Sequence, residues 1–355
     1  MVIIIAMLAS CAILVGISYL MLTILSGMIV VPRTPVRELA WEGELVLPLH
    51  DDRVADLHIS ADGRYLAFMV PDGEEALSSL KVTDLASDYA EVRSINVSSE
   101  RFAWLGENDT LVFEDEGDIQ LLQVADGTLN NLTASPELDR DPLPSPDGNY
   151  ILWTRVPGGS EGVEGGVWGL WVMSSDGSDK SYQAPLADLV TWHPEGNRLV
   201  SRSRSSSGEG DVDGNILQTA VLGAGRWDYY AECEEEVRYI WWPRDNDLLY
   251  VSPYTVGDKE MGVWTLVKRS DLLKKVVSTE GLGYDVRRYS FYPDGQGRRL
   301  AYIGERGLEY LDYQEKVIYR YTGLDAKVPL AWSENADHIY YVGAGGIYRV
   351  PARGD

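Results

Sequence analysis

The sequence predicts an all-β fold: a seven-bladed β-propeller with four-stranded blades, its ring closed by an N-terminal strand and preceded by one transmembrane helix. Three observations predict it. Residues 2–31 form an uncharged apolar run, short strand-like segments alternate with turn residues through the rest of the chain, and a motif recurs at intervals of roughly 40 to 50 residues. We therefore expect a transmembrane helix (signal anchor) at 1–31, a linker at 32–43 and the propeller at 44–355.

The clearest copy of the repeat reads Ser-Pro-Asp-Gly-Asn-Tyr-Ile-Leu-Trp at residues 145–153. Comparable copies begin with Ser-Ala-Asp-Gly at 60–63, His-Pro-Glu-Gly at 193–196 and Tyr-Pro-Asp-Gly at 292–295, and weaker copies begin near Trp104, Trp242 and Trp332. Pro presets φ, Asp accepts local backbone N–H bonds, and Gly adopts positive φ at little cost. Each copy is therefore predicted to be a strand, a tight turn and a second strand, with His193 in a structural turn position.

Two further strand-like segments follow each turn, and four strands in 40 to 50 residues are typical of a propeller blade. A large aromatic recurs just before the turn, where we expect it to pack between neighbouring blades; these residues are Trp104, Trp192, Trp241, Phe291 and Trp332. The last copy has only three strands, whereas an unassigned strand at 44–49 precedes the first. Because an open ring would leave two unpaired edges, that early strand is predicted to complete the last blade.

The Ser-Pro-Asp-Gly turn and the strand after it resemble the WD40-like PD40 repeat of TolB-type propellers, over residues 44–355. The resemblance implies a propeller, and such propellers serve as binding platforms, as peptidase gating domains and occasionally as lyases. TolB itself has an additional N-terminal α/β domain, for which the first 43 residues leave no room. The partners of TolB are therefore not implied.

The run at 2–31 exceeds the roughly 20 residues that span a bilayer as a helix, and Pro32 and Pro35 mark its end. A cleaved secretory signal and a lipoprotein box at residues 8–11 are the alternatives; the run lacks a basic n-region and is longer than a usual signal. Arg33 and Arg37 favour a cytoplasmic propeller, whereas three Asn-X-Ser/Thr sequons favour an exported one. Of the two sides, we expect the extracytoplasmic one, periplasmic or extracellular.

Acidic side chains outnumber basic ones 55 to 31, and the net charge is -24. Nucleic acid is excluded as a partner, because phosphate contacts need clustered Lys and Arg. We predict instead a protein partner in the same membrane or envelope. The two cysteines, Cys11 and Cys233, cannot build a disulfide framework or a cysteine zinc site within one chain.

Aligning the copies places charged residues at the starts of the innermost strands, which converge on one mouth of the central channel: Asp56, Arg101, Asp141, Arg238 and Arg288. Three arginines in an acidic protein predict an anion or carboxylate site there. The alternative is that the arginines pair with Asp56 and Asp141 and serve structure alone.

Other chemical signals are weaker. Asp211, Asp213 and Asn215 alternate around Gly214 as Ca²⁺ ligands do, but the closing Glu of an EF-hand is absent and an acidic hairpin is favoured. The Gly-x-Ser-x-Gly match at 158–162 opens no helix, as a nucleophile elbow must. The four histidines lack metal-ligand spacing. No metal and no cofactor are predicted.

We interpret the chain as a non-enzymatic, membrane-anchored propeller that acts as a protein-binding or scaffolding subunit of a membrane or envelope complex. The alternative is a propeller enzyme, a lyase or hydrolase, acting on acidic carbohydrate at the channel mouth. An enzyme needs convergent titratable groups in one pocket, whereas a scaffold needs an exposed apolar or aromatic patch.

The uncharged run at 2–31 generates the first testable prediction. The full-length chain should stay with membranes through alkaline and high-salt washing, and removal of residues 1–40 should release a soluble domain. Membrane fractionation with immunoblotting measures this. Recovery of the full-length chain in the soluble fraction would show that the run is no anchor.

Overall fold

The computed structural model describes residues 35–352, apart from gaps at 51–52, 73–76, 100, 107–108, 157–167, 185–188, 205–214, 225, 234–236, 238, 245–246, 253–261, 268–272, 279–290 and 305. The predicted transmembrane helix at 1–31 lies outside the described residues. Within them, no helix has the length and apolar character needed to cross a membrane.

The described residues form strands that associate into seven sheets, six of four strands and one of five. We number the blades in chain order. Blades 1 to 3 are β3 (Asp56–Ile59), β4 (Tyr65–Pro71), β5 (Ser78–Asp84) and β6 (Ala90–Val97); β7 (Phe102–Trp104), β8 (Thr110–Asp115), β9 (Asp118–Gln123) and β10 (Leu129–Asn131); and β11 (Leu138–Pro144), β12 (Tyr150–Val156), β13 (Gly169–Ser174) and β14 (Ser181–Ala184).

Blades 4 to 6 are β15 (Leu189–Trp192), β16 (Arg198–Arg204), β17 (Asn215–Val221) and β18 (Trp227–Cys233); β19 (Tyr239–Arg244), β20 (Asp247–Ser252), β21 (Gly262–Val267) and β22 (Leu273–Ser278); and β23 (Phe291–Pro293), β24 (Arg299–Gly304), β25 (Gly307–Asp312) and β26 (Val317–Tyr321), with β1 (Val36–Leu39) as a fifth strand. Blade 7 is β27 (Lys327–Trp332), β28 (His338–Gly343), β29 (Gly346–Pro351) and β2 (Glu44–Pro48).

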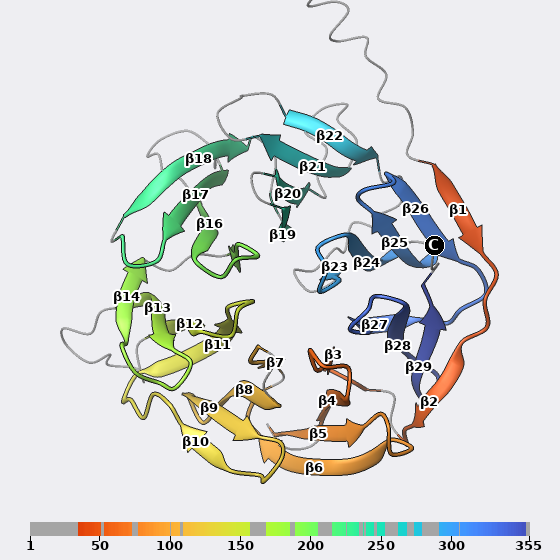
Figure 1. Ribbon diagram of the computed structural model, residues 1–355, viewed down its shortest axis with the longest axis horizontal. Coiled ribbons are helices and arrows are strands. Elements are labelled where there is room, and N and C mark those ends of the chain that lie inside the picture. The colour runs from red at the N-terminus through yellow and green to blue at the C-terminus, as the bar shows by residue number, and fades with distance from the viewer. Residues whose placement is uncertain are drawn as a thin grey trace, which may run out of the picture. The chain divides into compact units, whose positions relative to one another are not determined.

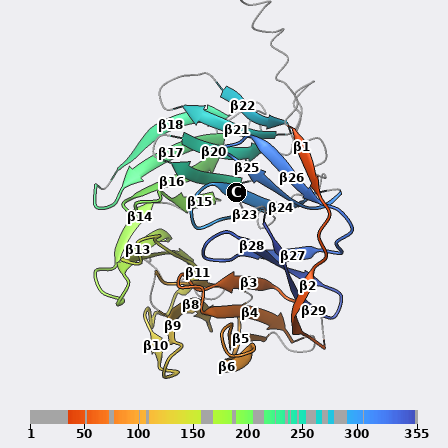
Figure 2. The same ribbon diagram turned by 45° about the vertical axis from the view of Figure 1, so that its right-hand side comes forward.

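The sheets are arranged in a ring around a central axis, with the first strand of each blade innermost (Figure 1). Turning the molecule shows β1 and β2 running along the outside of blades 6 and 7 (Figure 2). The predicted all-β propeller with four-stranded blades is therefore confirmed.

The ring closes as the sequence predicts. β2 pairs antiparallel with β29, from Glu44 opposite Arg349 to Pro48 opposite Gly346, so the early strand is the outer strand of blade 7. Val46 from this strand is buried in the core between blades 7 and 1. The pairing leaves neither blade 7 nor blade 1 with an open seam.

β1 was not expected, because its residues fall in the stretch assigned to the linker. It pairs in parallel with β26, from Val36 opposite Ile318 to Leu39 opposite Tyr321. The segment has only four residues, its side chains are mostly exposed, and its partner lies far along the chain. Neither alternation nor a nearby turn marks such a strand in the sequence.

The turns follow the predicted chemistry. In the first copy the Ser60 hydroxyl donates to Asp62 (2.6 Å) and accepts from the Tyr65 amide (2.9 Å), while Gly63 adopts a φ of +70°. The copy that begins at Ser145 has the same contacts. His193 fills this position in blade 4, where it is buried, and its Nδ1 accepts from the backbone amide of the residue two places later (3.2 Å). Its predicted turn role is confirmed.

The sixth copy is shifted by two residues from the predicted alignment. The Asp294 amide donates to the Arg299 carbonyl (2.9 Å), the bond that the Ser60 amide makes in blade 1, and Gly297 is the glycine with positive φ. Asp294 therefore occupies the Ser position, not the Asp position. In consequence Phe291 does not lie in the aromatic position of this copy, which Pro293 fills.

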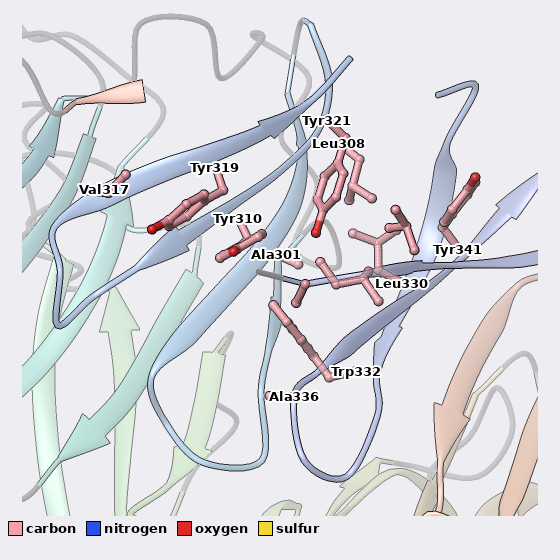
Figure 3. Close-up of a cluster of buried hydrophobic side chains, with 13 residues drawn as sticks. Ala301, Leu308, Tyr310, Val317, Tyr319, Tyr321, Leu330, Trp332, Ala336 and Tyr341 are labelled. Carbon is pink, nitrogen blue, oxygen red and sulfur yellow. The ribbon is translucent and has the colours of Figure 1, made fainter. Parts of the chain in front are cut away.

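The recurring tryptophans join neighbouring blades. The Trp192 indole of blade 4 donates to the Leu143 carbonyl of blade 3 (2.9 Å), and the Trp332 indole of blade 7 donates to the Tyr292 carbonyl of blade 6 (2.8 Å). Figure 3 shows Trp332 in the core formed by blades 6 and 7. Its ring meets that of Tyr310 edge-on, with 5.5 Å between centroids. For Trp192 and Trp332 the predicted packing role is confirmed.

Ring closure generates a prediction about stability. Val46→Ala should lower the free energy of unfolding by about 1.5 to 3 kcal/mol, because the side chain is buried at the closing seam. Leu45→Ala is the matched control, since Leu45 is 49% exposed on the same strand, and its effect should be within about 0.5 kcal/mol. Urea unfolding of both variants measures this. Equal midpoints for the two variants would contradict the closure.

Candidate functional site at the channel mouth

Asp56 and His58 lie two residues apart on β3, the innermost strand of blade 1. The Asp56 carboxylate contacts His58 Nε2 through one oxygen (3.0 Å) and accepts the Phe102 amide of blade 2 through the other (3.3 Å). The His58 ring meets the Phe102 ring edge-on at 5.0 Å between centroids. This pair therefore joins blades 1 and 2 at the channel and leaves the imidazole partly exposed.

The electrostatics of His58 favour its charged form. Burial lowers the pKa of His58, but the charge of Asp56 and the hydrogen bond to it outweigh burial, so the pKa is raised above its ordinary value. The imidazole consequently keeps its proton to higher pH than a free histidine. A protonated imidazole can bind a carboxylate or serve as a general acid.

Two tyrosines from other inner strands share this environment. Burial raises the pKa of Tyr239 on β19 and of Tyr292 on β23, and the Asp56 carboxylate adds to the effect at Tyr292. Both hydroxyls therefore stay protonated at physiological pH.

Sequence reasoning missed His58 and Tyr292 as site residues. Each lies two residues before the first residue of its turn, Ser60 and Asp294 respectively. The two are thus equivalent positions in blades 1 and 6. The shifted register of the sixth copy concealed this equivalence.

Arg101 and Asp141 come together as an ion pair between blades 2 and 3, with 3.2 Å between Nη1 and Oδ1. Both side chains are nearly half exposed, and such pairs contribute about 0 to 1 kcal/mol. Nearby, Arg140 contacts Glu114 (3.7 Å). Arg101 and Asp141 therefore pair with each other, as the structural alternative for the charged residues of the inner strands predicted. Asp56 pairs with His58 instead of with an arginine.

The remaining predicted residues cannot be placed. Arg238, Arg288, Asp211 and Asp213 lie outside the described residues, and Asn215 begins β17 with no described side chain. In the part of the chain that the structure describes, no three His, Cys, Asp or Glu side chains gather as a metal site would require.

The comparisons with known proteins concern the fold alone. No protein-family model and no curated protein matches the chain. Among solved structures, an oligogalacturonate lyase in complex with manganese has a TM-score of 0.61 at 10% identity, covering 88% of this chain and 96% of that one. The Cps50 (Swd1) propeller domain of Myceliophteria thermophila has a TM-score of 0.58 at 10% identity, covering 88% of this chain and 100% of that one. Kuenenia stuttgartiensis hydrazine synthase has a TM-score of 0.57 at 14% identity, covering 89% of this chain and 98% of that one.

These likenesses support the class of protein that the sheets define, a β-propeller. They include an enzyme and a WD40-type propeller, and at such low identity they show a shared fold without a shared activity. The PD40 and TolB relationship therefore stays a resemblance of motifs.

The His58–Asp56 pair generates a prediction about pH. A histidine whose pKa is raised by folding stabilises the protein below its unfolded pKa, and this stabilisation is lost as the pH rises through the folded pKa. Asp56→Asn should lower the pKa of His58, and His58→Gln should cost about 1 kcal/mol or less at pH 5.5 and less still at pH 8.5. Imidazole NMR titration and urea unfolding at the two pH values measure these effects. An unchanged His58 pKa in Asp56→Asn would contradict the assignment.

Proposed function

We propose that this chain is a membrane-anchored propeller that binds a protein partner of the same membrane or envelope and has no catalytic role of its own. The observation that carries the proposal is a group of exposed aromatic side chains on the outer wall of blades 3 and 4. Trp168, Tyr182 and Tyr229 expose 43%, 42% and 64% of their surface. Aromatic residues of this kind are enriched in protein interfaces and in their energetic hot spots.

We call these three residues the outer-wall patch, and one hydrogen bond joins the outer strands of the two blades that carry them. The Trp227 indole of β18 donates to the Gln183 carbonyl of β14 (3.0 Å), next to Tyr182. Tyr229 lies two residues after Trp227 and so shares its face of β18. The strands β14 and β18 are the outer strands of neighbouring blades on the rim of the ring (Figure 1).

Tyr182 is held in place from its own blade. Its ring packs edge-on against Trp171, at 6.1 Å between centroids. A Cβ added at Gly169 would come within 3.0 Å of the Tyr182 ring and would overlap the Ala184 carbonyl, so only glycine allows this approach. The neighbour of this glycine is Trp168. Tyr182 is therefore held in one orientation, which lowers the entropy cost of binding through it.

The anchoring part of the proposal depends on the apolar run at 2–31, and the extracytoplasmic side on the sequons. An exported propeller tethered by one helix would meet partners embedded in or attached to the same membrane. Such a tether raises the local concentration of both proteins and allows a modest interface to suffice.

A second candidate function is an enzyme, a lyase or hydrolase acting on acidic carbohydrate at the channel mouth. Two observations favour it: His58 with its raised pKa beside Asp56, and the likeness of the fold to that of an oligogalacturonate lyase. The protonated imidazole would bind a sugar carboxylate or donate a proton to the leaving oxygen.

Affinity purification of the full-length chain from its native membranes in mild detergent tests the proposal. The Tyr182→Ala and Tyr229→Ala double variant should lose at least tenfold of a specifically co-purifying chain, because truncating interface hot spots costs about 2 kcal/mol or more. Leu129→Ala, which removes a side chain that is 51% exposed on blade 2, should retain the partner.

Two results would count against the proposal. Equal capture by the double variant and by Leu129→Ala would show that the outer-wall patch is no interface. Turnover of an acidic oligosaccharide by the wild-type chain, lost in His58→Gln, would favour the enzyme instead.

A further inference from the structure

A pocket of about 550 Å³ opens on the outside of the ring between blades 6 and 7. It lies beneath residues 40–43, which we call the strap because they join β1 on blade 6 to β2 on blade 7. The other walls come from the segment after β26 and from the β28–β29 hairpin. The lining residues include Trp41, Glu42, Gly43, Asp325, Tyr341 and Tyr348.

Aromatic rings form one side of this strap pocket. Tyr341 and Tyr348 stack with 5.6 Å between centroids and 17° between planes. A Cβ at Gly43 would overlap the Tyr341 hydroxyl, and a Cβ at Gly343 would lie 2.8 Å from the Tyr348 ring. Glycine at these two positions therefore lets the strap and the hairpin close around the stacked pair. Trp41 adds a half-exposed indole from the strap.

The charged residues that line the pocket are all acidic. Glu42 and Asp325 line it, and no Lys, Arg or His does. Among the described residues neither carboxylate forms an ion pair, whereas nearby arginines are engaged: Arg349 holds Glu44 through two bonds (2.8 and 2.9 Å), and Arg37 contacts Glu315 (3.6 Å). Two carboxylates beside stacked aromatic rings form a site that is complementary to a cation.

The tyrosines do not add to this charge. Burial, together with Tyr348 and Asp325, raises the pKa of Tyr341 to about 12. Its hydroxyl is therefore neutral at physiological pH. Tyr341 itself is buried, so the rings open to a cation are those of Tyr348, which is partly exposed, and Trp41, which is half exposed. Attraction between a cation and the face of an aromatic ring is worth about 0.5 to 2 kcal/mol.

We propose that the strap pocket binds the guanidinium group of an arginine in an exposed segment of a partner protein. A guanidinium is planar, stacks on aromatic faces and offers a fork of N–H donors that matches carboxylates, so it uses both features of the pocket. The net charge of -24 draws a basic segment toward this surface.

The surroundings favour a side chain of a polypeptide over a free small cation. Val36, Trp41 and Leu45 are 43%, 50% and 49% exposed along the N-terminal segment on either side of the pocket. A small cation would leave these apolar side chains uncovered, whereas a peptide segment would lie across them. The inference rests on the proposed function in that the ligand belongs to a protein, but it concerns a surface other than the outer-wall patch.

Calorimetric titration of the full-length chain in mild detergent tests this. The probe is acetyl-Leu-Arg-Leu-amide, and the control is the same peptide with citrulline, which keeps the shape of arginine and removes its charge. The arginine peptide should bind at least tenfold more tightly, and Glu42→Gln and Asp325→Asn should each weaken it about tenfold, the scale of one charge-assisted hydrogen bond. Glu38→Gln, the same charge change at an exposed residue of β1 outside the pocket, should leave affinity within twofold.

Three results would overturn the proposal. Equal affinity for the two peptides would show that charge is not recognised. Equal losses in Glu38→Gln and Glu42→Gln would assign the effect to the overall field of the protein. Tetramethylammonium binding as tightly as the arginine peptide would indicate a site for free organic cations. The titration uses no native partner, and its variants change no residue of the outer-wall patch, so its failure and that of the proposed function are separate results.

Discussion

The pairing of β2 with β29 is the contact on which the rest of the molecule depends. It joins residues some 300 positions apart, as Glu44 and Arg349 show, and it removes the two open sheet edges that a linear array of blades would leave. Every blade then has two neighbours, and the innermost strands converge on one channel. The strap pocket follows from the same closure, because the chain crosses from blade 6 to blade 7 between β1 and β2.

The parts of the fold that the sequence predicts are those encoded locally. The Ser-x-Asp-Gly turns are readable because Ser60 and Ser145 bond to residues at most five positions away. β1 could not be predicted from the sequence, because its partner strand β26 lies far along the chain and its own four residues show no alternation of apolar and polar side chains. The alignment of the sixth copy was wrong because Pro-Asp-Gly at 293–295 is a good turn signal, whereas the glycine with positive φ in this turn is Gly297, two residues later.

The candidate sites, too, include contacts that the sequence could predict and contacts that it could not. The Arg101–Asp141 pair could be anticipated, because the repeat aligns the starts of neighbouring inner strands. The partnership of Asp56 with His58 could not, since a histidine two residues along a strand has no special signature. The strap pocket brings together the strap, the segment at 322–325 and a hairpin at 341–348, and no motif links segments so far apart. Only the ring closure makes them neighbours.

The distribution of charge separates the two functions proposed for this propeller. An acidic carbohydrate needs cations at the channel mouth, but there Arg101 is committed to Asp141 and the imidazole of His58 to Asp56. At these two described cations, binding an anion would have to displace the carboxylate that already pairs with each, in a protein whose net charge of -24 repels anions. At the strap pocket the balance is reversed, because Glu42 and Asp325 have no cationic partner among the described residues. A basic protein segment would satisfy these carboxylates without breaking any pair that the described residues form, and this difference in charge is what supports the proposal of protein binding at the strap pocket.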